Sequence, residues 1–271
     1  MITLEQLDLV RGLVRRAATD ELMSRFESVR ARLKADGSLI TAADLAMQSR
    51  LQTELAEHWP HFVLLGEEMS AVEQEDLLAP RGAGLWCLDP LDGTGNFAAG
   101  IPFFAVSLAL IGDGEVQAAV VYDPCRDECF SALKGRGAWL NGRPLVASAS
   151  PGALKESMAM VDLKRLPDVL VRALAAQPPY RSQRSFGSVA LDWCWIASGR
   201  CQVYLHGGQR LWDYAAGYLV MRESRAAGGL LAAYDGEWQT DFVLAPRIAI
   251  AAVHGDLLRQ WRDWIEQGLG S

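Results

Sequence analysis

The sequence predicts a mixed α/β fold, with an antiparallel-sheet half at the N-terminus and an α/β half at the C-terminus. Two observations support this prediction. In the first half, apolar residues recur at helical steps and then give way to short apolar runs divided by turn residues. After Pro151, predicted strands and helices alternate, which is the element order of an α/β sheet. The halves are expected to cover residues 1–148 and 149–271 and to work as one unit, because no long linker separates them.

Two amphipathic helices are predicted at the start of the chain. Apolar side chains recur at three- and four-residue steps over roughly the first 33 residues, which is typical of a helix packed on a core. A polar, glycine-bearing turn follows at residues 34–38. The same spacing returns from Ala42 to about Trp59, and Thr41 directly before it is a suitable N-cap.

Short apolar runs that end at Gly, Asp, Pro or Asn predict the strands. In the first half, the runs at residues 62–65 and 85–88 predict buried strands, and the runs at 104–111, 116–122 and 128–133 predict a meander, with a further turn at 141–142. Together they are expected to form an antiparallel sheet flanked by the two helices. In the second half the expected strands cover residues 157–161, 181–185, 201–205, 230–233 and 248–252. The expected helices of that half cover residues 166–176, 189–197 and 214–225, and a last one begins at 256. This order predicts a parallel or mixed second sheet.

Composition limits the class of protein. Half of the 271 residues are hydrophobic and 22% are charged, which excludes a disordered or fibrous chain. The apolar runs are far shorter than the ~20 residues of a membrane helix, and the N-terminus does not resemble a signal peptide, so we expect a cytoplasmic protein without a membrane partner. The net charge of −7 disfavours a nucleic-acid partner. The five cysteines are scattered and odd in number, which favours reduced thiols.

The densest chemical signal is the run Asp89-Pro-Leu-Asp-Gly-Thr-Gly-Asn-Phe97. Its two carboxylates stand at the end of an expected strand, followed by glycines and a threonine. This pattern directs oxygen atoms into one concavity, as hard divalent cations such as Mg²⁺ require. A short helix from Gly93 would add free N–H groups for a phosphate. The run also fits an ordinary surface turn, because Asp-Pro and Asp-Gly are common turn dipeptides.

Two further acidic sites have both a chemical and a structural interpretation. Glu67 and Glu68 follow an expected strand, where charges are often simply solvated. Asp213 lies in the run Trp212-Asp-Tyr-Ala-Ala-Gly217 at the start of an expected helix, where it would also serve as an N-terminal cap. Spacing alone does not separate these alternatives.

Taken together, these segments resemble the inositol monophosphatase family of Mg²⁺-dependent, lithium-sensitive phosphatases. The family signatures D-P-(I/L)-D-G-T-x-N-F and W-D-x-A-A-G match Asp89–Phe97 and Trp212–Gly217. Gly66-Glu-Glu68 matches a third element, and the segment from Leu39 to Asp44 resembles the early T-x-x-D element. The resemblance covers essentially the whole chain. It implies a layered αβαβα sandwich of the sugar phosphatase type, a catalytic centre in the cleft between the halves, and a homodimer.

The resemblance also implies two or three Mg²⁺ ions. The expected ligands of the two main ions are Glu67, Asp89, the carbonyl of Leu91, Asp92 and Asp213. Asp89 would belong to both ions, and Glu67 with Asp44 would lie near a weaker third ion. Such ions suit a phosphate monoester, because they lower the pKa of a bound water and cancel charge on the phosphoryl oxygens and the leaving alkoxide.

Other matching positions take catalytic and substrate-binding roles by resemblance. Thr94 would orient or deprotonate the attacking water with Glu67 or through Asp44, and the N–H groups of Gly93 and Thr94 would bind phosphate. The candidate substrate contacts are Asp92, Arg184, Ser185, Ser188, His206 and Asp213. His206 stands where inositol-cleaving members have a Glu that contacts ring hydroxyls, which puts inositol itself in question. A purely structural role for His206 or for Arg184 stays open.

The predicted reaction is hydrolysis of a small phosphate monoester by metal-activated water without a phosphoenzyme. The expected substrate is myo-inositol monophosphate or another polyol or sugar monophosphate. Alternatives of the same class are a 3′(2′),5′-bisphosphate nucleotide, histidinol phosphate and fructose 1,6-bisphosphate. An alternative of another class is a non-catalytic binding partner of the transcription machinery, a role that some bacterial relatives have.

Overall fold

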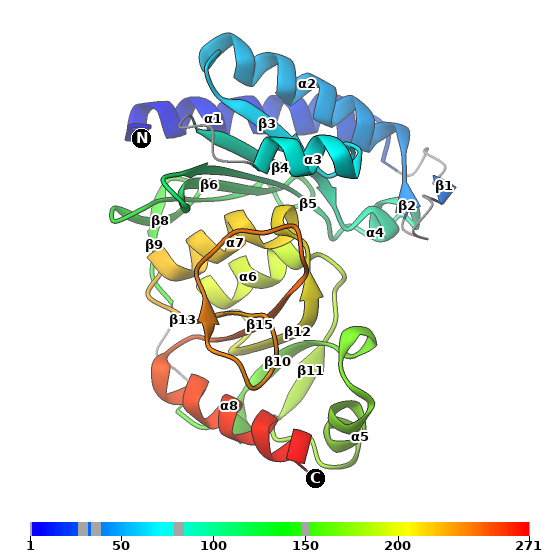
Figure 1. Cartoon of the computed structure of the whole chain (residues 1–271), viewed down its shortest axis with the longest axis vertical. Coiled ribbons are helices and arrows are strands. Elements are labelled where there is room, and N and C mark those ends of the chain that lie inside the picture. The colour runs from blue at the N-terminus through cyan, green and yellow to red at the C-terminus, as the bar shows by residue number, and fades with distance from the viewer. Residues whose placement is uncertain (1, 27–31, 34–38, 79–83, 148–151, 271) are drawn as a thin grey trace.

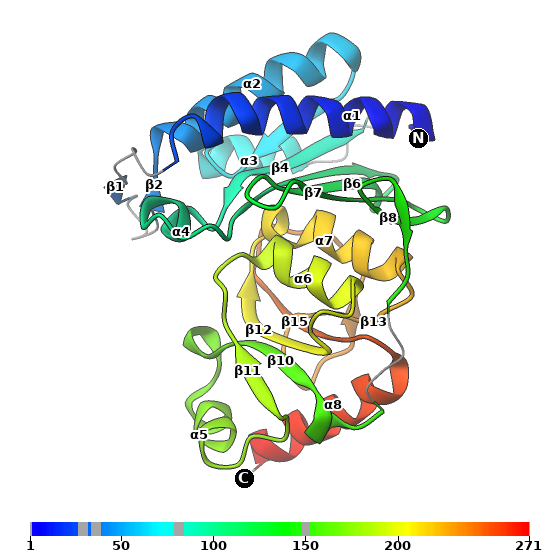
Figure 2. The same ribbon diagram turned by 180° about the vertical axis from the view of Figure 1, so that it is seen from behind.

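The computed structural model describes residues 2–26, 32–33, 39–78, 84–147 and 152–270. Figures 1 and 2 show helices and sheets stacked in alternating layers. In order, these are the helices α1 (Leu4–Ala17) and α2 (Ala42–His58), a seven-stranded sheet, the helices α6 (Val189–Ala197) and α7 (Leu211–Glu223), a six-stranded sheet, and the helices α5 (Asp168–Ala176) and α8 (Gly255–Gly270). The expected αβαβα sandwich is confirmed. None of the described helices has both the length and the apolar character that a membrane span needs.

The first helix is shorter than expected. α1 continues into a π-helical segment, Ala18–Met23, after which the described chain leaves the helix. The hydroxyl of Thr19 donates to the carbonyl of Arg15, and such local bonds compete with the regular helical ladder. The strand β1 (Arg32–Leu33) pairs with β2 (Leu39–Ile40) where the helix was expected to end. Residues 27–31 and the expected polar turn at 34–38 lie outside the described residues.

The first sheet has the strand order β3-β4-β5-β6-β7-β8-β9. Its strands are β3 (Val63–Gly66), β4 (Leu85–Asp92), β5 (Ala105–Gly112), β6 (Glu115–Asp123), β7 (Glu128–Leu133), β8 (Gly137–Leu140) and β9 (Arg143–Leu145). From β4 onward all neighbours are antiparallel, which confirms the meander. The expectation is wrong at one edge, where β3 and β4 are parallel. The reason is the helix α3 (Ala71–Leu78), which connects them as a crossover and was not predicted.

The second sheet has the order β11-β10-β12-β15-β13-β14 and is mixed, as expected. Its strands are β10 (Met158–Asp162), β11 (Ser182–Arg184), β12 (Val203–Gln209), β13 (Ala227–Leu231), β14 (Trp238–Gln239) and β15 (Arg247–Ala252). β10 pairs in parallel with both β11 and β12, whereas β15 runs antiparallel to its neighbours. The C-terminal ends of β10 and β12 therefore lie side by side.

The middle layer depends on a close approach of α6 and α7. A Cβ atom at Gly217 of α7 would lie 2.6 Å from the Cβ of Trp193 and 3.1 Å from the carbonyl oxygen of Ala190, both on α6. Any larger residue must push the helices apart. The glycine of the W-D-x-A-A-G run thus has a packing role, and it sets the distance between the two helices that carry part of the candidate site.

Replacing Gly217 with Ala is expected to lower the free energy of unfolding by about 1–3 kcal/mol, because the added methyl group overpacks the contact with Trp193. Urea denaturation followed by circular dichroism measures the change. The control is Gly255→Ala, since a Cβ at Gly255 meets nothing within 4 Å. Equal stability of the two variants would contradict the proposed packing role.

Candidate active site

β4 carries two of the expected ligands at its C-terminal end. Its pairing with β5 shifts register between Asp89 and Asp92, so the strand is irregular between these carboxylates. The N–H of Leu91 donates to Asp89 Oδ1 at 2.9 Å, which fixes the carboxylate beside its own strand. Both side chains are almost fully buried, Asp89 at 2% and Asp92 at 7% exposure. The run is therefore no surface turn.

Asp92 reaches across to the C-terminal half. Its Oδ2 accepts hydrogen bonds from the hydroxyl of Ser188 at 2.5 Å and from the N–H of Ala190 at 2.7 Å, and its Oδ1 accepts one from the N–H of Val189 at 3.2 Å. Ser188 is the N-cap of α6. The start of a helix favours a negative charge and supplies free N–H donors. Asp92 is thus held as an anion by the first turn of α6.

Asp213 lies in the first turn of α7, where its Oδ2 accepts a hydrogen bond from the N–H of Arg210 at 2.8 Å. The capping interpretation of Asp213 is therefore correct, but it does not exclude a chemical role. The hydroxyl of Ser107 on β5 donates to the carbonyl of Trp212 at 2.9 Å and ties the start of α7 to the first sheet.

Four carboxylates converge at this junction, and we call Glu67, Asp89, Asp92 and Asp213 the acid cluster. Burial raises the pKa of Asp89 well above its usual value, and the charges of Glu67, Asp92 and Asp213 raise it further. Burial also raises the pKa of Asp92 to about 6, although its three hydrogen bonds oppose the shift. Burial, Asp92 and Glu67 raise the pKa of Asp213. Carboxylates from the turn after β3, from β4 and from α7 therefore influence one another electrostatically.

The acid cluster has the donor set of a site for hard cations. Carboxylate and carbonyl oxygens are the ligands that Mg²⁺ prefers, and buried carboxylates that destabilise one another need a positive counter-charge. Among the described residues, no three acidic, histidine or cysteine side chains already enclose a point where an ion would fit. The carboxylates would therefore have to draw together around a cation, which their mutual repulsion opposes in its absence.

Thr94 and Asp44 form a pair beside the acid cluster. The Thr94 Oγ1 lies 3.1 Å from Asp44 Oδ1 and 3.0 Å from the carbonyl oxygen of Leu91, and its single proton is donated to one of them. Asp44 is fully buried in the first turn of α2, where its Oδ2 accepts hydrogen bonds from the N–H of Thr41 at 2.8 Å and the Thr41 hydroxyl at 2.6 Å. The lone pairs of Oγ1 are consequently oriented by two acceptors fixed in the protein.

Gly93 and Asn96 shape the loop after β4. Gly93 has a φ of 96°, and a Cβ there would lie 3.1 Å from the carbonyl oxygen of Phe103, so only glycine suits this position. The helix α4 (Thr94–Ala98) begins directly after it. The side-chain amide of Asn96 donates to the carbonyls of Phe103 and Phe186, each at 2.7 Å. The loop is thereby fixed to both halves of the molecule.

The expected substrate contacts do not all reach the acid cluster. Ser188 contacts Asp92 directly, but Ser185 is exposed and the Arg184 guanidinium donates to Ser182 Oγ and to the carbonyl of Gln183 in its own strand. No described contact joins Arg184 or Ser185 to the acid cluster, so their substrate role stays a prediction.

His206 is buried and fully hydrogen-bonded. Its Nε2 lies 3.1 Å from Asp162 Oδ2, and its Nδ1 accepts a hydrogen bond from the N–H of Gly208 at 3.2 Å. The ring is only 3% exposed, so neither nitrogen is free for a substrate in this structure. The alternative interpretation, a structural role, describes this residue better than the expected substrate contact. Asp162 was missed, although an acidic residue at the end of a predicted strand could have been noticed as Glu67 was.

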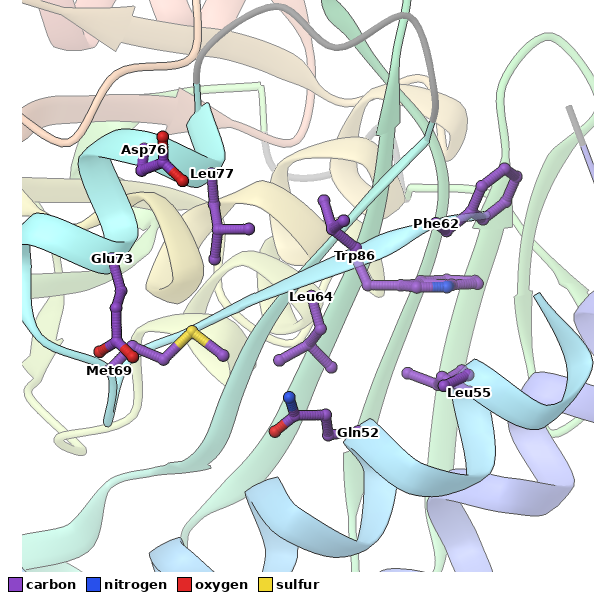
Figure 3. A pocket seen from close by; sticks show the side chains of 11 residues that line it. Gln52, Leu55, Phe62, Leu64, Met69, Glu73, Asp76, Leu77 and Trp86 are labelled. Carbon is purple, nitrogen blue, oxygen red and sulfur yellow. The ribbon is translucent and has the colours of Figure 1, made fainter. Parts of the chain in front are cut away.

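A separate pocket of about 360 Å³ lies between α2, α3 and the strands β3 and β4 (Figure 3). Trp86, Phe62 and Leu64 contribute apolar walls, and Glu73 and Asp76 of α3 add carboxylates. The acid cluster does not belong to the described lining of this pocket. The two sites are therefore different.

Known proteins share both the sequence and the fold. The sequence model of the inositol monophosphatase family matches residues 4–266. An inositol-1-monophosphatase of Mesorhizobium japonicum is 35% identical over 215 residues, which cover 78% of this chain and 77% of the relative. The Nus factor SuhB of Pasteurella multocida is 32% identical over 216 residues, 78% of each chain. The crystal structure of the extragenic suppressor protein SuhB from Bartonella henselae superposes with a TM-score of 0.83 at 28% identity, covering 97% of this chain and 99% of that one.

Asp89→Asn is expected to stabilise the cation-free protein at pH 8 by about 1 kcal/mol or more, because it removes a buried charge and keeps the acceptor for Leu91 N–H. Carboxyl groups with raised pKa values bind protons more tightly in the folded state. Their charge therefore costs stability as the pH rises through those values, about 6 for Asp92. The stability gained by Asp89→Asn should therefore decrease towards pH 4, where the Asp89 carboxyl group of the wild type is protonated.

Chemical denaturation in the presence of a chelator, at pH 4, 6 and 8, measures this difference. Asp113→Asn is the matched control, because Asp113 is exposed in the turn between β5 and β6. A loss of stability in Asp89→Asn at pH 8 would show that the carboxylate is not under electrostatic strain.

Proposed function

The chain belongs to the inositol monophosphatase family, and we propose that it hydrolyses a small phosphate monoester with Mg²⁺ as cofactor. The family consists of metal-dependent phosphatases. One observation supports the proposal above all others: although the two signatures lie far apart in sequence, the charges of Asp92 and Asp213 raise the pKa of Asp89, and the charge of Asp92 raises the pKa of Asp213. We propose further that the protein acts in the cytoplasm as a homodimer.

The donor set suggests how the ions would be shared. Glu67, Asp89 and the carbonyl of Leu91 would hold one ion, and Asp89, Asp92 and Asp213 a second, with Asp44 near a weaker third. Bound ions would lower the pKa of a water molecule and neutralise the phosphoryl oxygens. Lithium would inhibit by occupying one of these positions.

The protein itself would orient the reacting groups. Thr94 Oγ1 donates its proton to Asp44 or Leu91, so its lone pairs can accept a hydrogen bond from the attacking water and aim the oxygen at phosphorus. The N–H groups of Gly93 and Thr94 would bind phosphate oxygens. Water would attack phosphorus directly and release one proton to solvent, the bond to the alkoxide would break, and the alkoxide would take up a proton from solvent.

The proposed substrate is a polyol or sugar monophosphate such as myo-inositol monophosphate. The other candidates are 3′(2′),5′-bisphosphate nucleotides, histidinol phosphate and fructose 1,6-bisphosphate. With both nitrogens of His206 engaged in hydrogen bonds within the protein, no imidazole is available for ring hydroxyls, and this weakens the case for inositol itself.

Phosphate release from a panel of these monoesters tests the proposal. We expect turnover at millimolar Mg²⁺, inhibition by Li⁺, and activity that increases towards alkaline pH as the acid cluster ionises. Asp89→Asn should lower kcat by a factor of about 10³ or more, because the ligand shared by both ions loses its charge. Asp113→Asn, an exposed turn variant, should keep full activity. Absence of turnover on every substrate would overturn the proposal.

A second function is favoured by the relatives that carry the name Nus factor SuhB. We propose as the alternative that this chain binds the transcription machinery through an exposed surface. The variant Asp89→Asn separates the two functions, since it removes charge from a buried site and leaves the surface unchanged. A cellular phenotype that persists in a catalytically dead Asp89→Asn strain supports binding, whereas loss of both supports catalysis.

A further inference from the structure

Three polar side chains of the C-terminal half are joined to one another through a single carboxylate, that of Asp162. Asp162 ends β10, and its Oδ2 lies 3.1 Å from His206 Nε2 of β12 and 2.9 Å from a guanidinium nitrogen of Arg165. Arg165 lies in the short 3₁₀ helix Leu163–Arg165 that follows β10. The function proposed above gives no role to Asp162 or Arg165.

The surrounding backbone holds this arrangement in place. The N–H of Lys164 donates to the second carboxylate oxygen of Asp162 at 3.0 Å. A Cβ atom at Gly207 would lie 1.8 Å from the carbonyl oxygen of Arg165, so β12 and the 3₁₀ helix touch without a side chain between them. His206 is buried and its other nitrogen is hydrogen-bonded to the Gly208 N–H. Asp162 is therefore a fixed anchor for the guanidinium.

Arg165 lies beside the segment that leads into the acid cluster. Its Cδ is 3.9 Å from where a Cβ atom at Gly208 would stand, and Arg210, two residues further on, donates its N–H to Asp213 Oδ2 at 2.8 Å. Burial, Asp92 and Glu67 raise the pKa of Asp213, and the positive charge of Arg165 opposes them. The Arg165 side chain is nevertheless 51% exposed. One guanidinium nitrogen is held by Asp162, and the half-exposed side chain lies beside the segment that leads to Asp213. A planar guanidinium with free donors is suited to bind a carboxylate or phosphate through two parallel hydrogen bonds.

We propose that Arg165 is a specificity-determining residue that binds a second anionic group of the substrate. This inference rests on the proposed phosphatase function. Among the candidate substrates it favours phosphate monoesters that carry another phosphate or a carboxylate over the neutral polyol monophosphates. A neutral polyol has no group that matches a guanidinium. The imidazole that occupies the neighbouring position, His206, is closed to hydroxyl groups by its own hydrogen bonds. Asp162 and His206 act as positioning residues for Arg165.

Steady-state phosphate release with substrate pairs tests the proposal. Adenosine 5′-monophosphate is compared with adenosine 3′,5′-bisphosphate, and glycerol 1-phosphate with 3-phosphoglycerate, so that the members of each pair differ in the second anion. The enzymes are the wild type, Arg165→Ala, Arg165→Lys and the control Arg172→Ala. Arg172 lies on α5 and is 82% exposed. The two pairs distinguish a second phosphate from a carboxylate.

For at least one pair, the wild type should prefer the member with the second anion. Arg165→Ala should raise the KM of that member about 10- to 100-fold with little change in kcat, because a hydrogen bond to a charged group is lost. The KM of Arg165→Lys should lie between those of the wild type and Arg165→Ala, because lysine keeps the positive charge but cannot form two parallel hydrogen bonds. The members without the second anion should be affected less than about threefold, and Arg172→Ala should behave as the wild type. If Arg165 only supported the fold of its short 3₁₀ helix, its replacement would change the kinetic constants of both members of a pair equally.

Three results would overturn the proposal. One is turnover of the simple monoesters without any preference for a second anion, in which case the phosphatase function stands and the role of Arg165 is wrong. Another is an equal loss on both members of each pair in Arg165→Ala. The third is absence of turnover on all four substrates at millimolar Mg²⁺, which would overturn the proposed function together with this inference.

Discussion

The mutual repulsion of four carboxylates is the constraint on which the rest of the molecule depends. Burial together with the neighbouring charges opposes the ionisation of Asp89, Asp92 and Asp213 and raises their pKa values. The fold compensates only in part. Asp92 is stabilised by the first turn of α6, and Asp213 accepts the N–H of Arg210. The remaining negative charge would attract the proposed cation, so stability and the proposed chemistry oppose each other here.

The same constraint explains why several hydrogen bonds join the two halves near the acid cluster. Asp92 leaves β4 and is bound by α6, Ser107 of β5 donates to the carbonyl before Asp213, and Asn96 connects carbonyls from both halves. These bonds bring anionic side chains together that would otherwise drift apart. A separated N-terminal half would retain Asp89 without the donors that hold Asp92. The site therefore exists only where the two halves are in contact.

Much of the fold could be predicted because periodicity and turn residues report local structure. The bounds of α6 and the strand β7 agree with the apolar pattern, and the capping role of Thr41 follows from its type and position. α3 was missed because half of its eight residues are polar or acidic and only Gln74 is buried. The parallel pairing of β3 was missed with it. The acidic residues of the site could be named from the motifs. Their partners could not, since the bond from Ser188 to Asp92 and the enclosure of His206 by Asp162 depend on how distant strands and helices pack.

The two signature motifs contain residues needed for packing as well as the acidic residues of the site. Gly93 allows a backbone conformation and a close approach that no other residue permits, Phe97 is buried against Phe104, and Gly217 lets α7 approach α6. A sequence that kept only the aspartates would leave α7 too far from α6 for Asp213 to approach Asp92. Because packing residues and acidic residues must occur together for the charges to converge, a match to the full signature predicts the geometry of the junction as well as its chemistry. A lone Asp-Gly or Trp-Asp pair predicts neither.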